Sequence, residues 1–355
     1  MRVRREKDFL SFFDERTGRY FRTGVIRDGK DTGEDPFMTS FPELLDVGIM
    51  GHCRHGRMGL CQSAGVECYQ DGPHSDAPNM SLADFRELAR QCAGRTFQFA
   101  LGGRGDPDQH ENFAEILDLC AEFRIVPNYT TSGLGMTREL AELSKRRCGA
   151  VAVSWYRSPY TLQAVELLLE AGAKTNIHFV LSRNSLEEAT RLLQDGGFPR
   201  GINAVVFLLH KPVGLGRQEN VLHLGDEGLK EFIGLVGSGR LGVKVGVDSC
   251  TTPALVNAPG DVDLDSLDAC EGGRWSAYVA PDMRMLPCSF DDQERRWAVD
   301  LREDTVEGAW KSEVFDDFRA WSRHSCPECG QRHLCLGGCP VRPEITLCDR
   351  RERTR

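Results

Sequence analysis

Six short apolar runs alternate with longer amphipathic stretches along the chain up to residue 209. The runs lie at 46–50, 96–102, 125–130, 149–155, 175–181 and 203–209. Each run has the length and composition of a β-strand buried in a protein core. The pattern therefore predicts six strands in this part of the chain.

The stretches between the runs have a helical period. In 81–93 the apolar side chains recur every three or four positions, at Leu82, Phe85, Leu88, Ala89 and Cys92, and Ser81 is the expected N-cap. Residues 112–123 repeat this spacing, and we expect further helices at about 137–147, 159–171 and 185–195. Strands that alternate with helices predict parallel βαβ units with right-handed crossovers, so the expected fold class is α/β.

The alternation ends near residue 240, where glycine, proline and aspartate become frequent. We therefore divide the chain into three parts: a polar arm at 1–45 without strong periodicity, a strand–helix region at 46–240 and a cysteine-rich region at 241–355. The last part has few long apolar elements, so we do not expect it to hold a large core alone.

Composition and charge narrow the class of protein. Hydrophobic residues make up 40% of the chain and charged residues 27%, as in ordinary globular proteins. The net charge of −9 argues against a general nucleic-acid binder. No apolar stretch reaches the ~18 residues of a membrane span, and none of signal-peptide length follows the basic N-terminus. We expect a cytoplasmic protein with neither nucleic acid nor membrane as partner.

The 14 cysteines fall into groups that suggest different roles. In a reducing compartment, clustered cysteines more often bind metal than form disulfides. Cys53, Cys61 and Cys68 occupy a glycine-rich loop, spaced C-x7-C-x6-C, directly after the first strand. Parallel sheets carry their sites at the carboxyl ends of the strands, so this loop lies where a site is expected. Cys92, Cys120 and Cys148 are instead expected to fill the core.

The C-terminal region holds the most specific cysteine pattern. Cys326, Cys329, Cys335, Cys339 and Cys348 are spaced C-x2-C-x5-C-x3-C-x8-C, and Cys270 and Cys288 lie upstream. Seven thiols can supply one four-ligand zinc site with three left over, or two sites with one ligand missing. Iron–sulfur clusters also use C-x2-C pairs with further thiolates. The number favours two sites, with a single structural zinc as the alternative.

A glycine turn follows the second predicted strand. Gly102, Gly103 and Gly105 precede Asp106 and Pro107 in this turn. Glycines allow a ligand to approach the backbone closely. Because the strand neighbours the one that leads into the first cysteine loop, both segments are expected to face the same site.

At these residues the chain resembles the radical SAM superfamily, where SAM is S-adenosylmethionine. It resembles most closely the SPASM branch, many of whose members modify peptides. Typical members carry C-x3-C-x2-C after the first strand, a GGEP-like turn after the second, and the tail spacing described above. The resemblance covers roughly 46–348. It implies a partial (β/α)6 barrel, TIM-like, followed by a C-terminal cysteine-rich iron–sulfur domain.

Two positions depart from the family pattern. The first cysteine spacing is wider than usual, and the aromatic residue Tyr69 follows the third cysteine instead of preceding it. Met283 stands five residues before Cys288, where the family has glycine. A methionine does not easily adopt a positive φ, so we expect a different turn there.

The resemblance also implies the cofactors and their ligands. Cys53, Cys61 and Cys68 would hold a [4Fe–4S] cluster whose open iron binds SAM. The backbone of Gly102, Gly103 and Arg104 would hold the SAM amino group, with Ser154, Arg183 and Asn184 as candidates for ribose and carboxylate contacts. Cys326, Cys329, Cys335 and Cys348 would hold one auxiliary cluster, and Cys270, Cys288 and Cys339 part of another. Cys250 is a candidate fourth ligand, a catalytic thiol or a buried cysteine.

By the same resemblance, the leading hypothesis is an enzyme that cleaves SAM reductively to a 5′-deoxyadenosyl radical. It would modify a ribosomally made peptide by a crosslink or another side-chain change. A donor such as flavodoxin or ferredoxin would supply the electron. Two alternatives stay open: a radical SAM dehydrogenase or mutase of a small molecule, and a zinc-stabilised binding protein without enzymatic activity.

Overall fold

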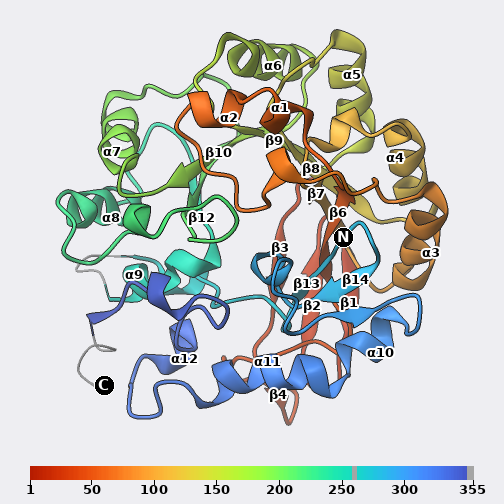
Figure 1. Cartoon of the computed structure of the whole chain (residues 1–355). Coiled ribbons are helices and arrows are strands. Elements are labelled where there is room, and N and C mark those ends of the chain that lie inside the picture. The colour runs from red at the N-terminus through yellow and green to blue at the C-terminus, as the bar shows by residue number, and fades with distance from the viewer. Residues whose placement is uncertain (258–261, 350–355) are drawn as a thin grey trace.

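A curved, mostly parallel sheet forms the centre of the protein, seen here in a computed structural model that describes residues 1–257 and 262–349 (Figure 1). Its parallel strands are β6 (Leu44–Met50), β7 (Gln98–Gly103), β8 (Val126–Thr131), β9 (Ala150–Ser154), β10 (Thr175–Leu181), β11 (Ala204–Leu209) and β12 (Val245–Val247). They lie side by side in chain order. The six predicted strands are confirmed as β6 to β11, and β12 extends the sheet beyond them.

Helices return the chain between consecutive strands and surround the sheet. They are α3 (Leu82–Cys92), α4 (Phe113–Glu122), α5 (Arg138–Arg147), α6 (Pro159–Glu170), α7 (Leu186–Asp195) and α8 (Leu229–Gly237). The Ser81 hydroxyl caps α3 by accepting a hydrogen bond from the Asp84 amide at 3.0 Å, as predicted. Cys92 and Cys120 are fully buried in the core, also as predicted, whereas Cys148 is partly exposed.

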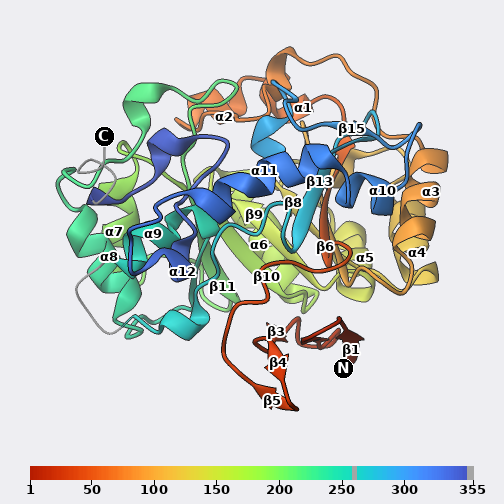
Figure 2. The same cartoon turned by 90° about the horizontal axis from the view of Figure 1, so that it is seen from below.

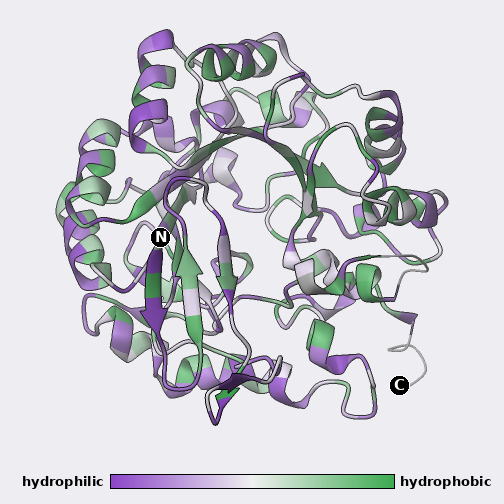
Figure 3. Ribbon diagram, turned by 180° about the vertical axis from the view of Figure 1, so that it is seen from behind, coloured by the Kyte–Doolittle hydropathy of each residue, from purple (hydrophilic) through white to green (hydrophobic). Residues whose placement is uncertain are grey.

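The two faces of the barrel strands have different chemistry. Side chains such as Val47, Phe99 and Phe179 are fully buried under the surrounding helices. Figure 3 shows the strands as mostly hydrophobic and the surrounding helices as mixed, with hydrophilic outer surfaces. The barrel interior instead carries polar side chains near the carboxyl ends, among them Thr130 and His178, whose side chains lie 3.3 Å apart. Polar side chains at the carboxyl ends of the strands are therefore available to bind a ligand.

The N-terminal arm forms a small sheet, which its irregular polar sequence did not predict. Strands β1 (Arg2–Arg5), β2 (Leu10–Phe13) and β3 (Tyr20–Arg22) pair antiparallel, and a two-residue pair, β4 (Ile26–Arg27) and β5 (Lys30–Asp31), follows. The small sheet lies at the amino-terminal end of the barrel strands (Figure 2). There Phe13 stacks on Phe97 with ring centroids 5.4 Å apart, and Arg4 donates to the Arg95 carbonyl at 2.9 Å.

The C-terminal region adds strands to the same sheet. It contains α9 (Thr252–Val256), β13 (Ser276–Val279), β14 (Arg284–Leu286), β15 (Val299–Asp300), α10 (Val306–Trp310), α11 (Glu313–His324) and α12 (Arg332–Cys335). Strand β13 pairs parallel to β6, with Tyr278 opposite Asp46, and β14 pairs antiparallel to β13. The sheet therefore continues through both predicted domain boundaries, which stay predictions: residue 45 lies within β6, and β12 and β13 follow residue 240. None of the described helices is long and apolar enough to cross a membrane.

The turn between β13 and β14 corrects one expectation. Met283 has a φ of 67°, in the left-handed region that favours glycine. The expectation that methionine would change this turn is therefore wrong. The Met283 side chain is only 2% exposed and packs in the main core, and this burial offsets the cost of the backbone conformation.

Candidate functional site

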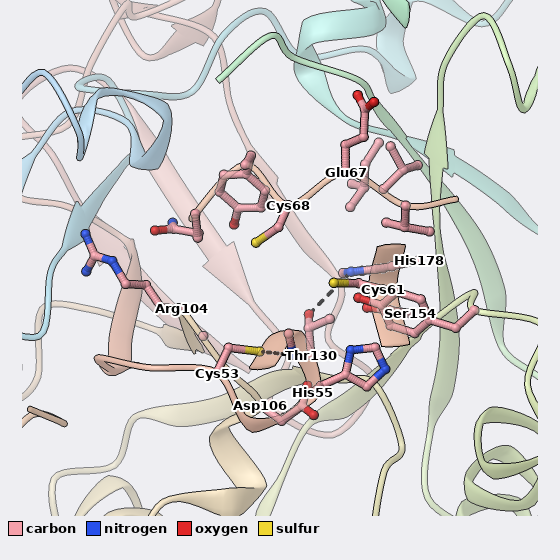
Figure 4. A pocket seen from close by; sticks show the side chains of 18 of the residues that line it. Cys53, His55, Cys61, Glu67, Cys68, Arg104, Asp106, Thr130, Ser154 and His178 are labelled. Carbon is pink, nitrogen blue, oxygen red and sulfur yellow. Dashed lines mark hydrogen bonds between the residues drawn. The ribbon is translucent and has the colours of Figure 1, made fainter. Parts of the chain in front are cut away.

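A cavity of about 380 Å³ opens at the carboxyl ends of the barrel strands, at the opposite end from the N-terminal sheet. Asp46, Gly102, Thr130, Ser154, His178 and His210 line it from successive strands and the loops after them. The loop after β6 lines another side of it (Figure 4). A parallel sheet thus brings residues more than 150 positions apart to one place, as expected for this fold class.

Two one-turn helices take up the extra residues of the first cysteine loop. Cys53 is the N-cap of α1 (Arg54–Arg57), and its sulfur accepts a hydrogen bond from the Gly56 amide at 3.1 Å. Cys61 lies in α2 (Leu60–Ser63), which begins after Gly59 in a left-handed conformation. Cys68 follows in a segment without regular secondary structure. All three cysteines line the cavity, where Figure 4 shows their side chains around one space.

The charge environment of these thiols suits a metal cluster. Burial, with smaller contributions from the nearby Asp106 carboxylate and the other two thiols, raises the pKa of Cys53 to about 12. Burial also raises the pKa of Cys61. Thiols in such surroundings become thiolates only when a strong positive charge binds between them, which iron supplies. Within residues 1–257 and 262–349 no three His, Cys, Asp or Glu side chains converge on a single ion, whereas a cubane cluster binds each thiolate to a different iron.

The structure places most of the predicted SAM-contacting residues at this cavity. Gly102, Gly103, Arg104, Ser154 and Asn184 line it. Arg183 is absent from the lining: its guanidinium donates to Asp226 Oδ1 at 3.2 Å and to the Glu219 carbonyl at 3.1 Å. Its role in binding SAM stays a prediction, as do those of the residues that line the cavity.

The glycines after β7 serve two purposes. A side chain on Gly103, which has a φ of 111°, would clash with the Met50 backbone, and one on Gly105 would clash with the His52 carbonyl. These two glycines therefore let the turn pack against the start of the cysteine loop. A Cβ on Gly102 would meet no atom within 4 Å, so Gly102 leaves open space at the cavity wall.

Several polar residues of the cavity were not singled out from the sequence. The Tyr278 hydroxyl and the Gln70 amide nitrogen are buried and have no hydrogen-bond partner among the described residues. Asp46 lies opposite Tyr278, and burial, with a smaller effect of Glu271, raises its pKa to about 7. In the sequence, Asp46 could have been recognised as a charged residue inside the apolar run LLDVGIM. Unsatisfied buried polar groups beside a cavity suggest contacts to a ligand.

A second group of thiols lies in the C-terminal region. Its members are Cys250, Cys270, Cys288 and Cys339. A hydrogen bond with Cys339, followed by burial, raises the pKa of Cys250 well above its usual value. Burial, together with the Cys250 thiol, raises the pKa of Cys270 to about 12. Burial also raises that of Cys288, with contributions from Cys270 and Cys250. The structure therefore places Cys250 with the three cysteines that lacked a fourth partner.

The remaining four cysteines form a third group. Burial raises the pKa of Cys335, and the thiols of Cys348, Cys326 and Cys329 raise it further. The Cys329 amide donates to the Cys326 carbonyl at 3.1 Å, which closes the C-x2-C turn. Electrostatic interactions between thiols thus link eleven cysteines in groups of three, four and four, and all of them are free thiols.

Comparisons with known proteins agree with this geometry. Residues 270–331 match the family model of SPASM, an iron–sulfur cluster-binding domain. SuiB from Streptococcus suis bound to S-adenosylmethionine has a TM-score of 0.63 at 16% identity, over 88% of this chain and 77% of that one. SuiB bound to its precursor peptide SuiA has a TM-score of 0.63 at 15% identity, over 88% of this chain and 75% of the SuiB chain. The anSMEcpe structure with bound AdoMet and Cp18Cys peptide has a TM-score of 0.60 at 16% identity, over 86% and 92%.

No curated protein sequence matches the chain. The structural likenesses establish the fold, which is that of the radical SAM enzymes. The family model establishes the C-terminal iron–sulfur domain, although its match begins at Cys270 and does not include the first cysteine loop. The predicted resemblance is confirmed: the chain has the radical SAM fold and carries a SPASM iron–sulfur domain.

Proposed function

We propose that the chain is a radical SAM enzyme that cleaves SAM reductively and modifies a peptide. The observation that carries this proposal is the position of Cys53, Cys61 and Cys68. These three thiols line one cavity at the carboxyl ends of a radical SAM barrel that is followed by a SPASM domain. A [4Fe–4S] cluster held by the three would supply the electron that converts SAM to methionine and a 5′-deoxyadenosyl radical.

The residues of this chain would bind and orient SAM around that cluster. The open wall at Gly102 accommodates a ligand beside the backbone, and Ser154 and Asn184 offer hydrogen-bonding groups farther along the strand ends. His178, whose pKa burial lowers to about 4, is uncharged at neutral pH and adds no positive charge beside the sulfonium. The cavity is partly open to solvent, so bound SAM and substrate would have to cover its mouth to keep water from a reactive radical.

The wall formed by β6, β13 and the end of the cysteine loop supports a substrate subsite on the other side of the cavity. Tyr278 and Gln70 there hold hydrogen-bonding atoms without partners among the described residues, and Asp46 adds a carboxyl group. Peptide backbones present both carbonyl acceptors and amide donors, which suits this set of groups. The SuiB and anSMEcpe structures with bound peptides support the same substrate class. The electron donor, flavodoxin or ferredoxin, stays a prediction.

The test is anaerobic reconstitution followed by incubation with SAM and dithionite. We expect formation of 5′-deoxyadenosine, and a mass change in a short peptide encoded beside the gene. The matched control is the Cys92→Ala variant, which removes a core thiol and should keep both activities. Failure of cluster-loaded protein to release 5′-deoxyadenosine would contradict the proposed chemistry. Turnover of a small molecule instead of any peptide would contradict the proposed substrate class.

A further inference from the structure

Lys211 carries a buried positive charge beside the second thiol group. It follows β11, and its side chain is only 3% exposed. Its ammonium group donates a hydrogen bond to Asp248 Oδ2 and lies 4.5 Å from the centre of the Phe290 ring. The preceding residue, His210, lines the cavity, so Lys211 lies between the cavity and the C-terminal region.

Both contacts of Lys211 lie next to cysteines of the second group. Asp248 precedes Cys250 by two residues, and Phe290 follows Cys288 by two residues. The Lys211 ammonium also interacts electrostatically with the thiols of Cys250 and Cys339. Lys211 also interacts electrostatically with the Cys288 thiol, so one cation interacts with three cysteines from distant parts of the sequence. This position is independent of the sequence motif, since Lys211 lies 39 residues before Cys250.

A buried lysine needs a specific reason to be retained. Moving an ammonium group out of water costs several kcal/mol, and one carboxylate partner only partly offsets this cost. The position of Asp248 is itself fixed, because it accepts hydrogen bonds from the Leu209 amide at 3.0 Å and from the Thr251 hydroxyl at 2.9 Å. A methionine would fill the same space without the cost. The charge therefore favours something anionic, and four thiolates around an iron–sulfur core are a strongly anionic group.

We propose that Lys211 is a positioning residue that raises the reduction potential of an iron–sulfur cluster held by Cys250, Cys270, Cys288 and Cys339. The proposal rests on the proposed function, which makes these cysteines cluster ligands. Reduction adds one negative charge to the cluster. A fixed cation nearby stabilises the reduced state more than the oxidised state, and second-sphere charge is a known determinant of cluster potential.

The test is a redox titration of the cluster-loaded, substrate-free protein followed by electron paramagnetic resonance. We expect Lys211→Met to lower the midpoint potential of one cluster and to leave the other two unchanged. Lys211→Arg keeps the charge and should stay close to the wild-type potential. Asp248→Asn removes the opposing charge and should shift the same cluster in the opposite direction.

The matched control is Lys174→Met, at the amino-terminal end of the barrel, where the Lys174 ammonium bonds the Thr17 carbonyl. This variant should change no potential. Unchanged potentials in a Lys211→Met protein with full iron content would overturn the proposal. If the Lys211→Met protein loses iron, the Asp248→Asn variant provides the test instead. In that case, an unchanged or lower midpoint potential of the cluster in Asp248→Asn would overturn the proposal. Lack of 5′-deoxyadenosine formation by the wild type contradicts only the proposed function, because the titration is read without SAM or substrate.

Discussion

The ring of Tyr69 packs against the ring of Phe290, with centroids 4.8 Å apart. Tyr69 directly follows Cys68 of the first thiol group, and Phe290 follows Cys288 of the second by two residues. The contact joins the cysteine loop of the barrel to the SPASM region. Each ring lies within two residues of a cysteine from a different thiol group, and the contact holds the loop by side-chain packing that does not require metal.

Replacing Cys53, Cys61 and Cys68 together by Ala should therefore leave the fold intact. The variant should lose about four of roughly twelve iron atoms per chain and all formation of 5′-deoxyadenosine, because one of three cubane clusters is removed. Iron analysis, circular dichroism and chromatography of the nucleoside products check this. Continued SAM cleavage by the triple variant would show that the loop is not the SAM site.

Replacing Cys250 by Ala tests its place in the second thiol group. Because Cys250 interacts with Cys339, Cys270 and Cys288, the variant should alter the spectrum of one auxiliary cluster and abolish peptide modification. SAM cleavage should continue, since the first thiol group is separate. Cys120→Ala, which removes a fully buried core thiol, is the control with unchanged spectra. Normal spectra with lost product would instead make Cys250 a catalytic thiol.

The Tyr278→Phe variant removes one buried hydroxyl that has no partner among the described residues and keeps the ring. Deleting an unsatisfied polar atom should leave the melting temperature equal or slightly higher. Peptide modification should fall at least about 10-fold, which corresponds to one lost hydrogen bond of about 1.4 kcal/mol. SAM cleavage without peptide should stay unchanged. Equal rates of modification in both proteins would remove Tyr278 from the substrate subsite.

Met283 offers a test in which glycine should be better tolerated than alanine. At a φ of 67° glycine avoids a cost of about 1 kcal/mol that alanine keeps, and both lose the buried methionine side chain. We expect both variants to be less stable than the wild type by about 2–4 kcal/mol, with Met283→Gly the more stable of the two. Thermal unfolding of the two proteins under argon compares them. The opposite order would show that the turn is not left-handed in solution.

Asp46 should make stability depend on pH. Its folded-state pKa of about 7 lies above the ordinary value of 3.8, so the folded protein binds this proton more tightly than the unfolded chain. The stabilising effect is complete below pH 3.8 and is lost as the pH rises to about 7. Asp46→Asn mimics the protonated form and does not titrate. Its stability advantage over the wild type should therefore grow as the pH rises from 5 to 8. A difference in melting temperature between the two proteins that stays the same at every pH would contradict this assignment.

The sequence alone determined much of this protein, because local patterns carry the information. Apolar runs and helical periods placed six strands and their helices, because burial sets a characteristic spacing of apolar side chains in each kind of element. The spacing of Cys326, Cys329 and Cys335 indicated a metal centre, because ligands close together in the chain must bind within one short turn, and the resemblance to the SPASM branch implied that the metal is an iron–sulfur cluster. Ser81 as a cap and Cys92 as a core residue followed from the same local rules.

Only the tertiary structure decided which distant residues meet. The pairing of β13 with β6 brings Tyr278 opposite Asp46, and no local pattern encodes a contact across more than 200 residues. The grouping of Cys250 with Cys339, and the burial of Lys211 between Asp248 and Phe290, likewise depend on how the C-terminal region packs against the barrel. Met283 is a residue whose local preference was overruled by tertiary packing. Its intrinsic preference opposed a left-handed turn, and the free energy gained by burying its side chain in the assembled core outweighed that preference.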